Sequence, residues 1–597
     1  MHRHGAPRRT AAGPGPATAG PVPRGAAPRA TVPARTVPAR TLPTRTGPLL
    51  AAGLLLGAPL LGGCVSASGG DPEPAPTSPA SSGPASSSAS GGPSTTAASA
   101  PATAPPQQPP AELTEGQVNA AVARIDDYAR NALAKTGVPG LALAVVYKDK
   151  VIHAQGLGVR QLGRPEAVDP DTVFQLASVS KPISSTVVAG LVGQKVVKWD
   201  DPVAAHDPGF ALADPWVSSH VTIADLFAHR SGLPDHAGDL LEDLGYQRDY
   251  ILQHLRDHTL APFRASYAYT NYGLTEAAVA VAKAKGVAWE DLAADVLYKP
   301  LGMNSTSSLR SAYDSAADKA TPHVRDAAGW HVSTTENPDP QAPAGGVSST
   351  VQDLGRWMRL QLADGTFEGK RIVDPAGLNE TRLPQTVSAP ATAPAGRTGF
   401  YGLGWNVSYD AEGRLRLNHS GAFSLGASTV VTLLPSEQLG LVVLSNGQPS
   451  GVPEAVAEEF FDVAQNGHET VDWLSFMGKV VPAAAQSPAS PTDYAAPPAG
   501  AAPAKPDSAY LGTYANGYFG PMTVASGDGG GLVMSLGPDD LRFPLQHYDG
   551  DVFSFRTRGE NAAGLSGVTF TLGADGKAAT VVVEQFDHDG LGTFTRS

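Results

Sequence analysis

Cysteine is nearly absent from this chain, because Cys64 is the only one among 597 residues. A single thiol cannot form an intramolecular disulfide, so the folded domains must be held together by their hydrophobic cores. Long hydrophobic runs are lacking as well. The apolar run at 49–61 is too short for a helix that crosses a bilayer, which needs about 20 residues.

Two widespread catalytic signatures are also missing. The sequence contains no GxSxG motif, in which a nucleophilic serine lies on a sharp turn between a strand and a helix. It also lacks an HxHxDH cluster, and the Asp and His residues near 547–551 and 584–590 fall where β-turns are expected. These absences disfavour an α/β-hydrolase and a metal-dependent hydrolase, so no metal and no cofactor is predicted.

The first 48 residues hold eight arginines, a degenerate VPART repeat and no acidic residue, and such a segment cannot build a core. A basic segment followed by a short apolar one is typical of a secretory signal. The next residues, Leu61-Gly62-Gly63-Cys64, resemble the bacterial lipobox, in which the cysteine is acylated. We therefore expect a signal segment at 1–63 and a protein held by Cys64 on the extracytoplasmic face of the cell membrane.

Residues 64–111 consist mainly of Ser, Ala, Gly, Pro and Thr, a composition that predicts a disordered, flexible tether. The formal net charge of −13 includes the leader arginines, so the remaining chain is more acidic still. A surface of this sign repels phosphate backbones, which argues against nucleic acid as a partner. The expected partners are a small-molecule or peptide substrate, the membrane through the lipid, and the cell wall.

Order begins with a helical pattern capped by Thr114 and ended by Gly137 within a Lys-Thr-Gly triplet. Two β-rich runs follow, joined at Lys148-Asp149-Lys150, and a second such hairpin lies far downstream at 428–447. Strands at both ends with helices between them imply one antiparallel sheet and a helical insertion beside it. The fold class is therefore α+β, with this domain at 112–467.

The C-terminal part changes character. Residues 468–506 combine a helical apolar stretch with a Pro- and Ala-rich linker. Short alternating runs separated by Gly and Asp turns fill 507–597 and predict a small all-β barrel or sandwich.

Candidate catalytic residues occur in a short motif that reads FQLASVSK. Ser178 and Lys181 are three residues apart on a predicted helix, so their side chains can share a hydrogen bond. A free serine hydroxyl is a poor nucleophile, and a neighbouring amine is one way to draw off its proton.

Two further motifs carry groups of complementary chemistry. Tyr269-Thr270-Asn271 opens a helix; a nearby ammonium favours the phenolate of Tyr269, and Asn271 can hold Lys181 or a substrate carbonyl. His419-Ser420-Gly421-Ala422 precedes the strand at 428, and Gly421 allows a close backbone approach. The amides of Ala422 and Ser178 can together bind a tetrahedral oxyanion.

In this order the three motifs are similar to the SxxK, YxN and KTG or HxG motifs of the penicillin-recognising serine enzymes, in their class C β-lactamase-related branch. Further blocks similar to that family are VTIADLFAHRSGLPDH from 221, LYKPLGMNSTS from 297, PAGGVSSTVQDLGRWM from 343 and YGLGWNV from 401. The resemblance covers about 112–467, and the segment from 510 looks like a β-domain of unknown function often appended to such hydrolases.

The resemblance implies a β-lactamase/penicillin-binding-protein-like transpeptidase fold, an antiparallel sheet flanked by helices plus a helical subdomain, followed by a small barrel-like domain. It implies that Ser178 attacks an acyl carbonyl while Lys181 and Tyr269 share the proton transfers, with Tyr269 activating the water that releases the acyl group. Substrate binding is expected from Asn271, His419, Gly421 and Ala422. His229, within the block from 221, is expected to be a loop histidine that fixes nearby backbone.

His419 stands where many relatives have lysine, and in the family this difference accompanies esterases, D-amino-acid peptidases and carboxypeptidases at least as often as β-lactamases. A neutral histidine also weakens capture of a substrate carboxylate. The preferred interpretation is an acyl-enzyme hydrolase of D-amino-acid peptides, cell-wall fragments or small esters. The alternatives are a true β-lactamase and a catalytically idle envelope-binding protein, although the intact Ser178, Lys181 and Tyr269 argue against idleness.

Overall fold

The structure is a computed structural model that describes residues 112–391 and 396–597. The predicted signal segment, Cys64 and the predicted tether lie outside these residues. No helix within the described part is both long enough and apolar enough to cross a membrane. The boundaries assigned above to the five segments of the chain stay predictions.

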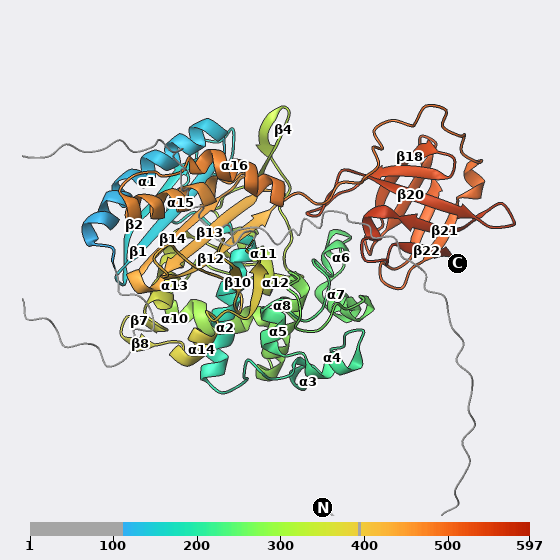
Figure 1. Ribbon diagram of the computed structural model, residues 1–597. Coiled ribbons are helices and arrows are strands. Elements are labelled where there is room, and N and C mark those ends of the chain that lie inside the picture. The colour runs from blue at the N-terminus through green and yellow to red at the C-terminus, as the bar shows by residue number, and fades with distance from the viewer. Residues whose placement is uncertain (1–111, 392–395) are drawn as a thin grey trace, which may run out of the picture. The chain divides into compact units, whose positions relative to one another are not determined.

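An antiparallel sheet of eight strands forms the centre of the first folded part. Its strand order is β2-β1-β14-β13-β12-β11-β10-β9. The first strand along the chain, β1 (Gly140–Tyr147), pairs with β14 (Leu439–Ser445), the last strand of this sheet. β1 also pairs with β2 (Lys150–Gly158), and β14 with β13 (Ala427–Leu434). The predicted closure of one sheet by the two ends of the domain is confirmed (Figure 1).

Local chemistry explains the first elements. Helix α1 (Glu115–Thr136) starts with a capping box between Thr114 and Gln117, in which each side chain satisfies a backbone N–H of the other. It ends at Gly137, whose φ of 74° is left-handed, a conformation that glycine adopts without steric cost. The Lys-Thr-Gly triplet there is thus a helix terminus, as predicted.

Helices cover both faces of the sheet (Figure 1). Leu141, Leu143 and Val145 of β1 join one core with α1 and α15 (Val452–Asn466). The alternate residues Ala142, Ala144 and Val146 join the second core with α2 (Ser180–Gly193) and α13 (Val351–Leu362). Because successive side chains of a strand point to opposite faces, a strand buried on both faces is apolar throughout, which explains GLALAVVY.

Short elements between β2 and β9 build the helical region beside the sheet. Its helices are α3 (Val203–His206), α4 (Pro215–His220), α5 (Ile223–Phe227), α6 (Asp239–Asp243), α7 (Arg248–His254), α8 (Asn271–Lys285), α9 (Trp289–Ala293), α10 (Lys299–Leu301), α11 (Arg310–Ser315), α12 (Ala342–Gly345) and α14 (Pro375–Glu380). The small paired strands are β3 (Phe174–Gln175) with β6 (Ser348–Ser349), β4 (His323–Asp326) with β5 (Gly329–Val332), and β7 (Thr366–Phe367) with β8 (Lys370–Arg371).

The third motif lies in a strand that the sequence analysis did not predict. Residues 419–422 belong to β12 (Leu415–Phe423), which pairs with β13 so that Gly421 faces Thr429. Beyond β12 the sheet continues through β11 (Asn406–Tyr409), β10 (Gly399–Tyr401) and β9 (Thr386–Ala389). These strands are short and carry many polar residues, so neither length nor alternation marks them clearly.

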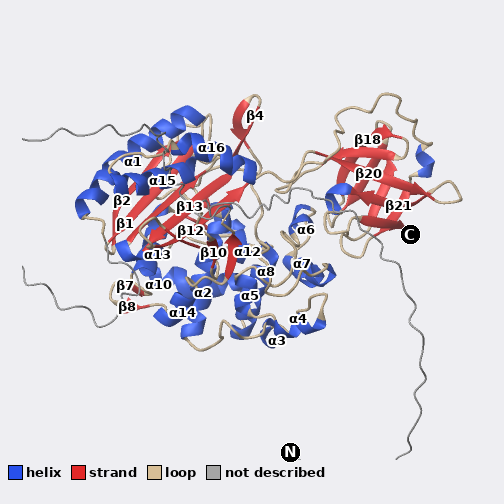
Figure 2. Ribbon diagram, in the orientation of Figure 1, coloured by secondary structure: helices blue, strands red, loops and turns tan. Residues whose placement is uncertain are grey.

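The C-terminal residues form a closed barrel, which confirms the predicted small all-β module (Figure 2). Helix α16 (Trp473–Ala484) precedes it. The barrel strands are β15 (Gly512–Ala515), β16 (Met522–Ser526), β17 (Leu532–Leu536), β18 (Leu541–Asp549), β19 (Val552–Arg556), β20 (Leu565–Leu572), β21 (Ala578–Val583) and β22 (Thr593–Arg596). Closure leaves no unpaired sheet edge in this module.

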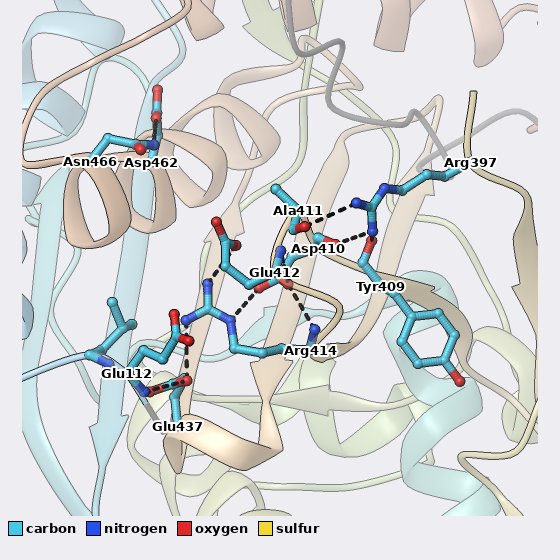
Figure 3. A network of polar contacts seen from close by, with 11 residues as sticks. Glu112, Arg397, Tyr409, Asp410, Ala411, Glu412, Arg414, Glu437, Asp462 and Asn466 are labelled. Carbon is cyan, nitrogen blue, oxygen red and sulfur yellow. Dashed lines mark hydrogen bonds and ion pairs between the residues drawn. The ribbon is translucent and has the colours of Figure 1, made fainter. Parts of the chain in front are cut away.

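A buried ionic network ties the start of the described chain to the sheet (Figure 3). Arg414, only 2% exposed, donates to Asp410 at 2.6 Å and to Glu437 at 3.2 Å. Glu437 in turn accepts hydrogen bonds from the backbone N–H groups of Glu112 and Leu113, at 3.1 and 3.0 Å.

Replacing Arg414 with alanine should lower the free energy of unfolding by about 3–5 kcal/mol, because it leaves two buried carboxylates without their cation. Chemical denaturation would measure the loss. The matched control is Arg130→Ala, since the Arg130 side chain is 56% exposed and pairs with Asp126 and Asp127 on the surface. That control should cost less than about 1 kcal/mol; equal losses in the two variants would contradict the account of Arg414.

Candidate active site

The first motif occupies the junction between β3 and α2. Ser178 lies in a short 3₁₀ turn, Ala177–Val179, and its side chain is half-buried. Ala177 has a φ of 46°, a left-handed conformation that is strained for a residue with a side chain. The turn is held by Thr429 of β13, whose hydroxyl donates to the carbonyl of Leu176 at 2.7 Å.

Lys181 is fully buried and its amine has three polar neighbours. Nζ lies 2.9 Å from Ser178 Oγ, 2.7 Å from Asn271 Oδ1 and 3.0 Å from the carbonyl oxygen of Ala344 in α12. The predicted hydrogen bond between Ser178 and Lys181 is therefore present, and two further acceptors fix the direction of the amine.

The second motif lies at the start of α8. The Tyr269 hydroxyl donates to Ser178 Oγ at 2.8 Å, and its ring centroid is 4.5 Å from Lys181 Nζ. Asn271 uses its oxygen for Lys181 and its nitrogen for Asp239, to which Nδ2 donates at 2.9 Å. Of the two roles expected for Asn271, the geometry provides the one of holding Lys181.

His229 fixes backbone beside the second motif, as expected. Its Nδ1 accepts a hydrogen bond from the Thr270 N–H at 3.1 Å, and its ring packs between those of Tyr269 and Tyr401. The side chain is 1% exposed.

The third motif brings β12 against the nucleophile. A Cβ on Gly421 would overlap the carbonyl oxygen of Leu176 and come within 2.9 Å of Ser178 N, so only glycine fits at this position. The backbone of Gly421 and Ala422 therefore runs beside the amide of Ser178. This arrangement can present two amides to one oxyanion.

His419 is 4% exposed and uses both ring nitrogens within the protein. Nδ1 lies 2.7 Å from the carbonyl oxygen of Ser420, which can only accept, so Nδ1 carries the hydrogen. Nε2 is then the acceptor for the Tyr401 hydroxyl at 2.9 Å. In this neutral tautomer the one N–H group of the ring is engaged with the protein.

Burial controls the ionisation of this cluster. It lowers the pKa of Lys181 to about 7, although the negative charges of Asp239 and Glu242 oppose the shift. Burial raises the pKa of Tyr269 above its ordinary value, in spite of the hydrogen bond to Ser178. Burial and the positive charge of Lys181 lower the pKa of His419 to about 3. A neutral amine, a protonated phenol and a neutral imidazole are therefore available near pH 7.

Sequence reasoning missed Asp239, Tyr401 and the carbonyl of Ala344 as members of this cluster. The sequence did offer a signal for two of them, because both lie in segments that resemble the family. Tyr401 opens the segment YGLGWNV, and Ala344 lies in the segment that begins PAGG. Asp239 lies just beyond the end of the block from 221, so nothing in the sequence pattern marked it.

The barrel contacts the turn that follows the third motif. The carboxylate of Glu560 accepts hydrogen bonds from the backbone N–H groups of Ser424 and Leu425, at 2.5 and 3.2 Å. Asp243 of α6 in turn accepts from the backbone N–H groups of Glu560 and Asn561, at 2.8 and 3.0 Å. Within the described residues, no group of three or more His, Cys, Asp and Glu side chains is arranged to hold a metal ion.

Comparison with known families agrees with this geometry. The family model described as Beta-lactamase matches residues 125–464, and the model of a domain of unknown function matches 496–593. Among solved structures, the octameric penicillin-binding protein homologue from Pyrococcus abyssi has a TM-score of 0.51 at 18% identity. It covers 78% of this chain and 98% of that one. The predicted fold class is confirmed.

Two curated relatives illustrate the similarity in sequence. Penicillin-binding protein 4 of Amycolatopsis lactamdurans is 32% identical over 338 residues, which cover 54% of this chain and 83% of that protein. The D-alanyl-D-alanine-carboxypeptidase/endopeptidase AmpH of Escherichia coli is 24% identical over 330 residues, which cover 54% of this chain and 84% of that protein.

Proposed function

Because this chain belongs to the β-lactamase family of serine hydrolases, we propose that it hydrolyses an amide or ester substrate through an acyl-enzyme on Ser178. The observation that carries the proposal is the contact of Ser178 Oγ with both Lys181 Nζ, at 2.9 Å, and the Tyr269 hydroxyl, at 2.8 Å. A nucleophile, a base and an acid are thus within proton-transfer distance of one another.

The hydrogen-bond pattern supports Lys181 as the base. A neutral amine has two hydrogens and one lone pair, and two of the three neighbours of Lys181 can only accept, namely Asn271 Oδ1 and the Ala344 carbonyl. The lone pair therefore faces Ser178, whose hydroxyl proton it takes as Oγ attacks the acyl carbonyl. The developing oxyanion is held by the backbone N–H groups of Ser178 and Ala422.

Tyr269 acts as the acid. Burial keeps its phenol protonated, so it donates its proton to the leaving group when the tetrahedral intermediate collapses, and the Lys181 ammonium replaces that proton. A water molecule then attacks the acyl-enzyme and gives a proton to the neutral amine. The bond between the acyl carbon and Ser178 Oγ breaks, the Lys181 ammonium returns the proton to Oγ, and the acid product leaves. This assignment differs from the expectation that Tyr269 activates the water, because a buried phenol resists ionisation.

The third motif supports a choice of substrate class. His419 is neutral and both ring nitrogens are engaged with Tyr401 and Ser420, so it supplies no charge for the carboxylate of a β-lactam. We therefore favour D-amino-acid peptides, cell-wall fragments and small esters over β-lactams. The similarity to a D-alanyl-D-alanine-carboxypeptidase supports the peptide.

Three substrates distinguish these possibilities. A nitrophenyl acetate ester and an acylated D-Ala-D-Ala peptide should be turned over, whereas nitrocefin should be hydrolysed more slowly than either or should only acylate the enzyme. Rapid nitrocefin turnover with no hydrolysis of the ester or the peptide would identify a true β-lactamase instead.

The rate should depend on pH through Lys181. Because the amine must be neutral and burial lowers its pKa to about 7, kcat/KM for the nitrophenyl ester should rise as the pH increases through about 7 and then level off. Initial rates corrected for spontaneous hydrolysis would measure the profile. A midpoint near the ordinary lysine value of 10.5, or no dependence on pH, would contradict the assignment of the base.

We further propose that the enzyme is exported and anchored to the outer face of the cell membrane by a lipid on Cys64, where peptide fragments of the cell wall are within its reach. The basic leader, the apolar run at 49–61 and the cysteine that follows support this proposal. Metabolic labelling with a fatty acid should mark the full-length protein but not the Cys64→Ser variant; equal labelling of both would refute the anchor.

A further inference from the structure

A short loop before α6 encloses the second motif. The carboxylate of Asp235 accepts from the Tyr269 N–H at 2.6 Å, and the His236 N–H donates to the Tyr269 carbonyl at 2.8 Å. Asp239, at the start of α6, accepts from Asn271 Nδ2 at 2.9 Å. The loop reaches these positions through left-handed backbone at His236 and Gly238, with φ values of 59° and 97°.

The carboxylate of Asp239 decides which way the amide of Asn271 points. A carboxylate can only accept, so it selects the nitrogen end of the amide and turns the oxygen toward Lys181. With the amide reversed, its N–H group would face the amine and would take up the lone pair that Ser178 needs. The orientation of Asn271 is therefore a condition for the amine to act as a base.

Asp239 cannot take part in the reaction directly. It is 4% exposed, its Oδ2 also lies 2.8 Å from His236 Nδ1, and it reaches Ser178 only through Asn271 and Lys181. Its second oxygen, Oδ1, has no hydrogen-bond partner among the described residues. A buried, incompletely paired carboxylate is costly, and such cost is typical of groups retained for a functional reason.

We propose that Asp239 is a positioning residue of this hydrolase, which orients the Asn271 amide so that the Lys181 amine is directed at Ser178. This inference rests on the proposed function and extends it to a residue outside the three motifs. Asp239 then has two separable effects. Its carboxylate oxygen fixes the orientation of the Asn271 amide, and its negative charge favours the ammonium form of Lys181.

The charge effect has a defined sign. Several titratable groups face Asp239. They are His236 and Asp235 on its own loop, Lys181 across Asn271, Glu242 one turn along α6, Tyr269 and Tyr272 around the start of α8, and the Tyr518 phenol of the barrel. Negative charge at Asp239 favours the ammonium form of Lys181 and so opposes the fall in its pKa that burial causes. Removing the charge should therefore move the rise of the pH–rate profile to lower pH.

Two substitutions separate the effects. Asp239→Asn keeps an oxygen that can accept from Asn271 but loses the charge, so the midpoint of the profile should fall while kcat at high pH changes less than about fivefold. Asp239→Ala loses both, so the midpoint should fall and kcat should drop about 10- to 100-fold with little change in KM, because the base is misdirected. Active sites are counted from the initial burst of nitrophenol, and rates are expressed per active site. Unfolded protein then does not lower the measured kcat.

The matched control is Asp235→Asn, which alters a carboxylate of the same loop that accepts a hydrogen bond from the Tyr269 backbone N–H and none from Asn271 among the described residues. It should leave the midpoint where the unmodified protein has it. The proposal is overturned if Asp239→Ala retains the kcat and midpoint of the unmodified protein, or if Asp235→Asn moves the midpoint as far as Asp239→Asn does. Failure of the proposed function would be distinct, since the Ser178→Ala variant would then still hydrolyse the ester.

Discussion

Replacing Ser178 with alanine should reduce hydrolysis of a nitrophenyl ester by about 10⁴-fold or more, to a rate near that of the uncatalysed reaction. The variant retains the oxyanion amides and the buried amine but has no atom that can form the acyl-enzyme. Initial rates with the ester, together with thermal unfolding of both proteins, measure the effect. The fold should be unchanged, because among the described residues the Ser178 hydroxyl forms hydrogen bonds only with Lys181 and Tyr269.

The control for this substitution is Ser219→Ala. Ser219 is an exposed serine of α4 whose hydroxyl donates to the carbonyl of Trp216, so its loss should leave the rate within about twofold, since a surface substitution of this kind has little effect. Full activity in Ser178→Ala with an unchanged thermal transition would rule out Ser178 as the nucleophile.

Replacing Lys181 with alanine should lower kcat about 10²- to 10⁴-fold, because the serine then loses the group that takes its proton. KM for a small neutral ester should change little, since the buried amine contacts Ser178, Asn271 and Ala344 rather than solvent. The rise of kcat/KM near pH 7, which deprotonation of Lys181 causes in the unmodified enzyme, should also be lost from the pH–rate profile.

Added ethylamine provides an internal control for Lys181→Ala. The truncated side chain leaves a cavity lined by the acceptors that held the amine, and a small amine that enters it should restore part of the rate in proportion to its neutral form. A Lys181→Ala variant with nearly full activity and the original pH profile would show that another group is the base.

The main helices and strands could be predicted because the residues that indicate them lie within a few positions of each element. Thr114 and Gly137 mark the two ends of α1, and the motif spacing placed Ser178 beside Lys181 before any contact was known. The strands β9 to β12 could not be predicted, because their largely polar segments become strands only by pairing with the neighbouring strands of the sheet.

The site was predictable where the chemistry lies within one motif and not where it arises from packing. The turn that contains the left-handed Ala177 is held by Thr429, far along the sequence, and Tyr401 meets His419 only because β10 and β12 lie in one sheet. The same holds for the roles proposed for Lys181 and Tyr269, which rest on burial that lowers the pKa of the amine and raises the pKa of the phenol. Sequence reasoning identified the pair but could not divide the work between them.

The formation of a covalent acyl group on Ser178 is the central claim and can be observed directly. The protein would be mixed with penicillin or a slowly hydrolysed nitrophenyl ester, quenched in acid, digested and analysed by mass spectrometry. We predict one acyl group per molecule, on the peptide that contains Ser178, and none in the Ser178→Ala variant. Steady turnover with no adduct on that peptide, or an adduct on another residue, would contradict the mechanism.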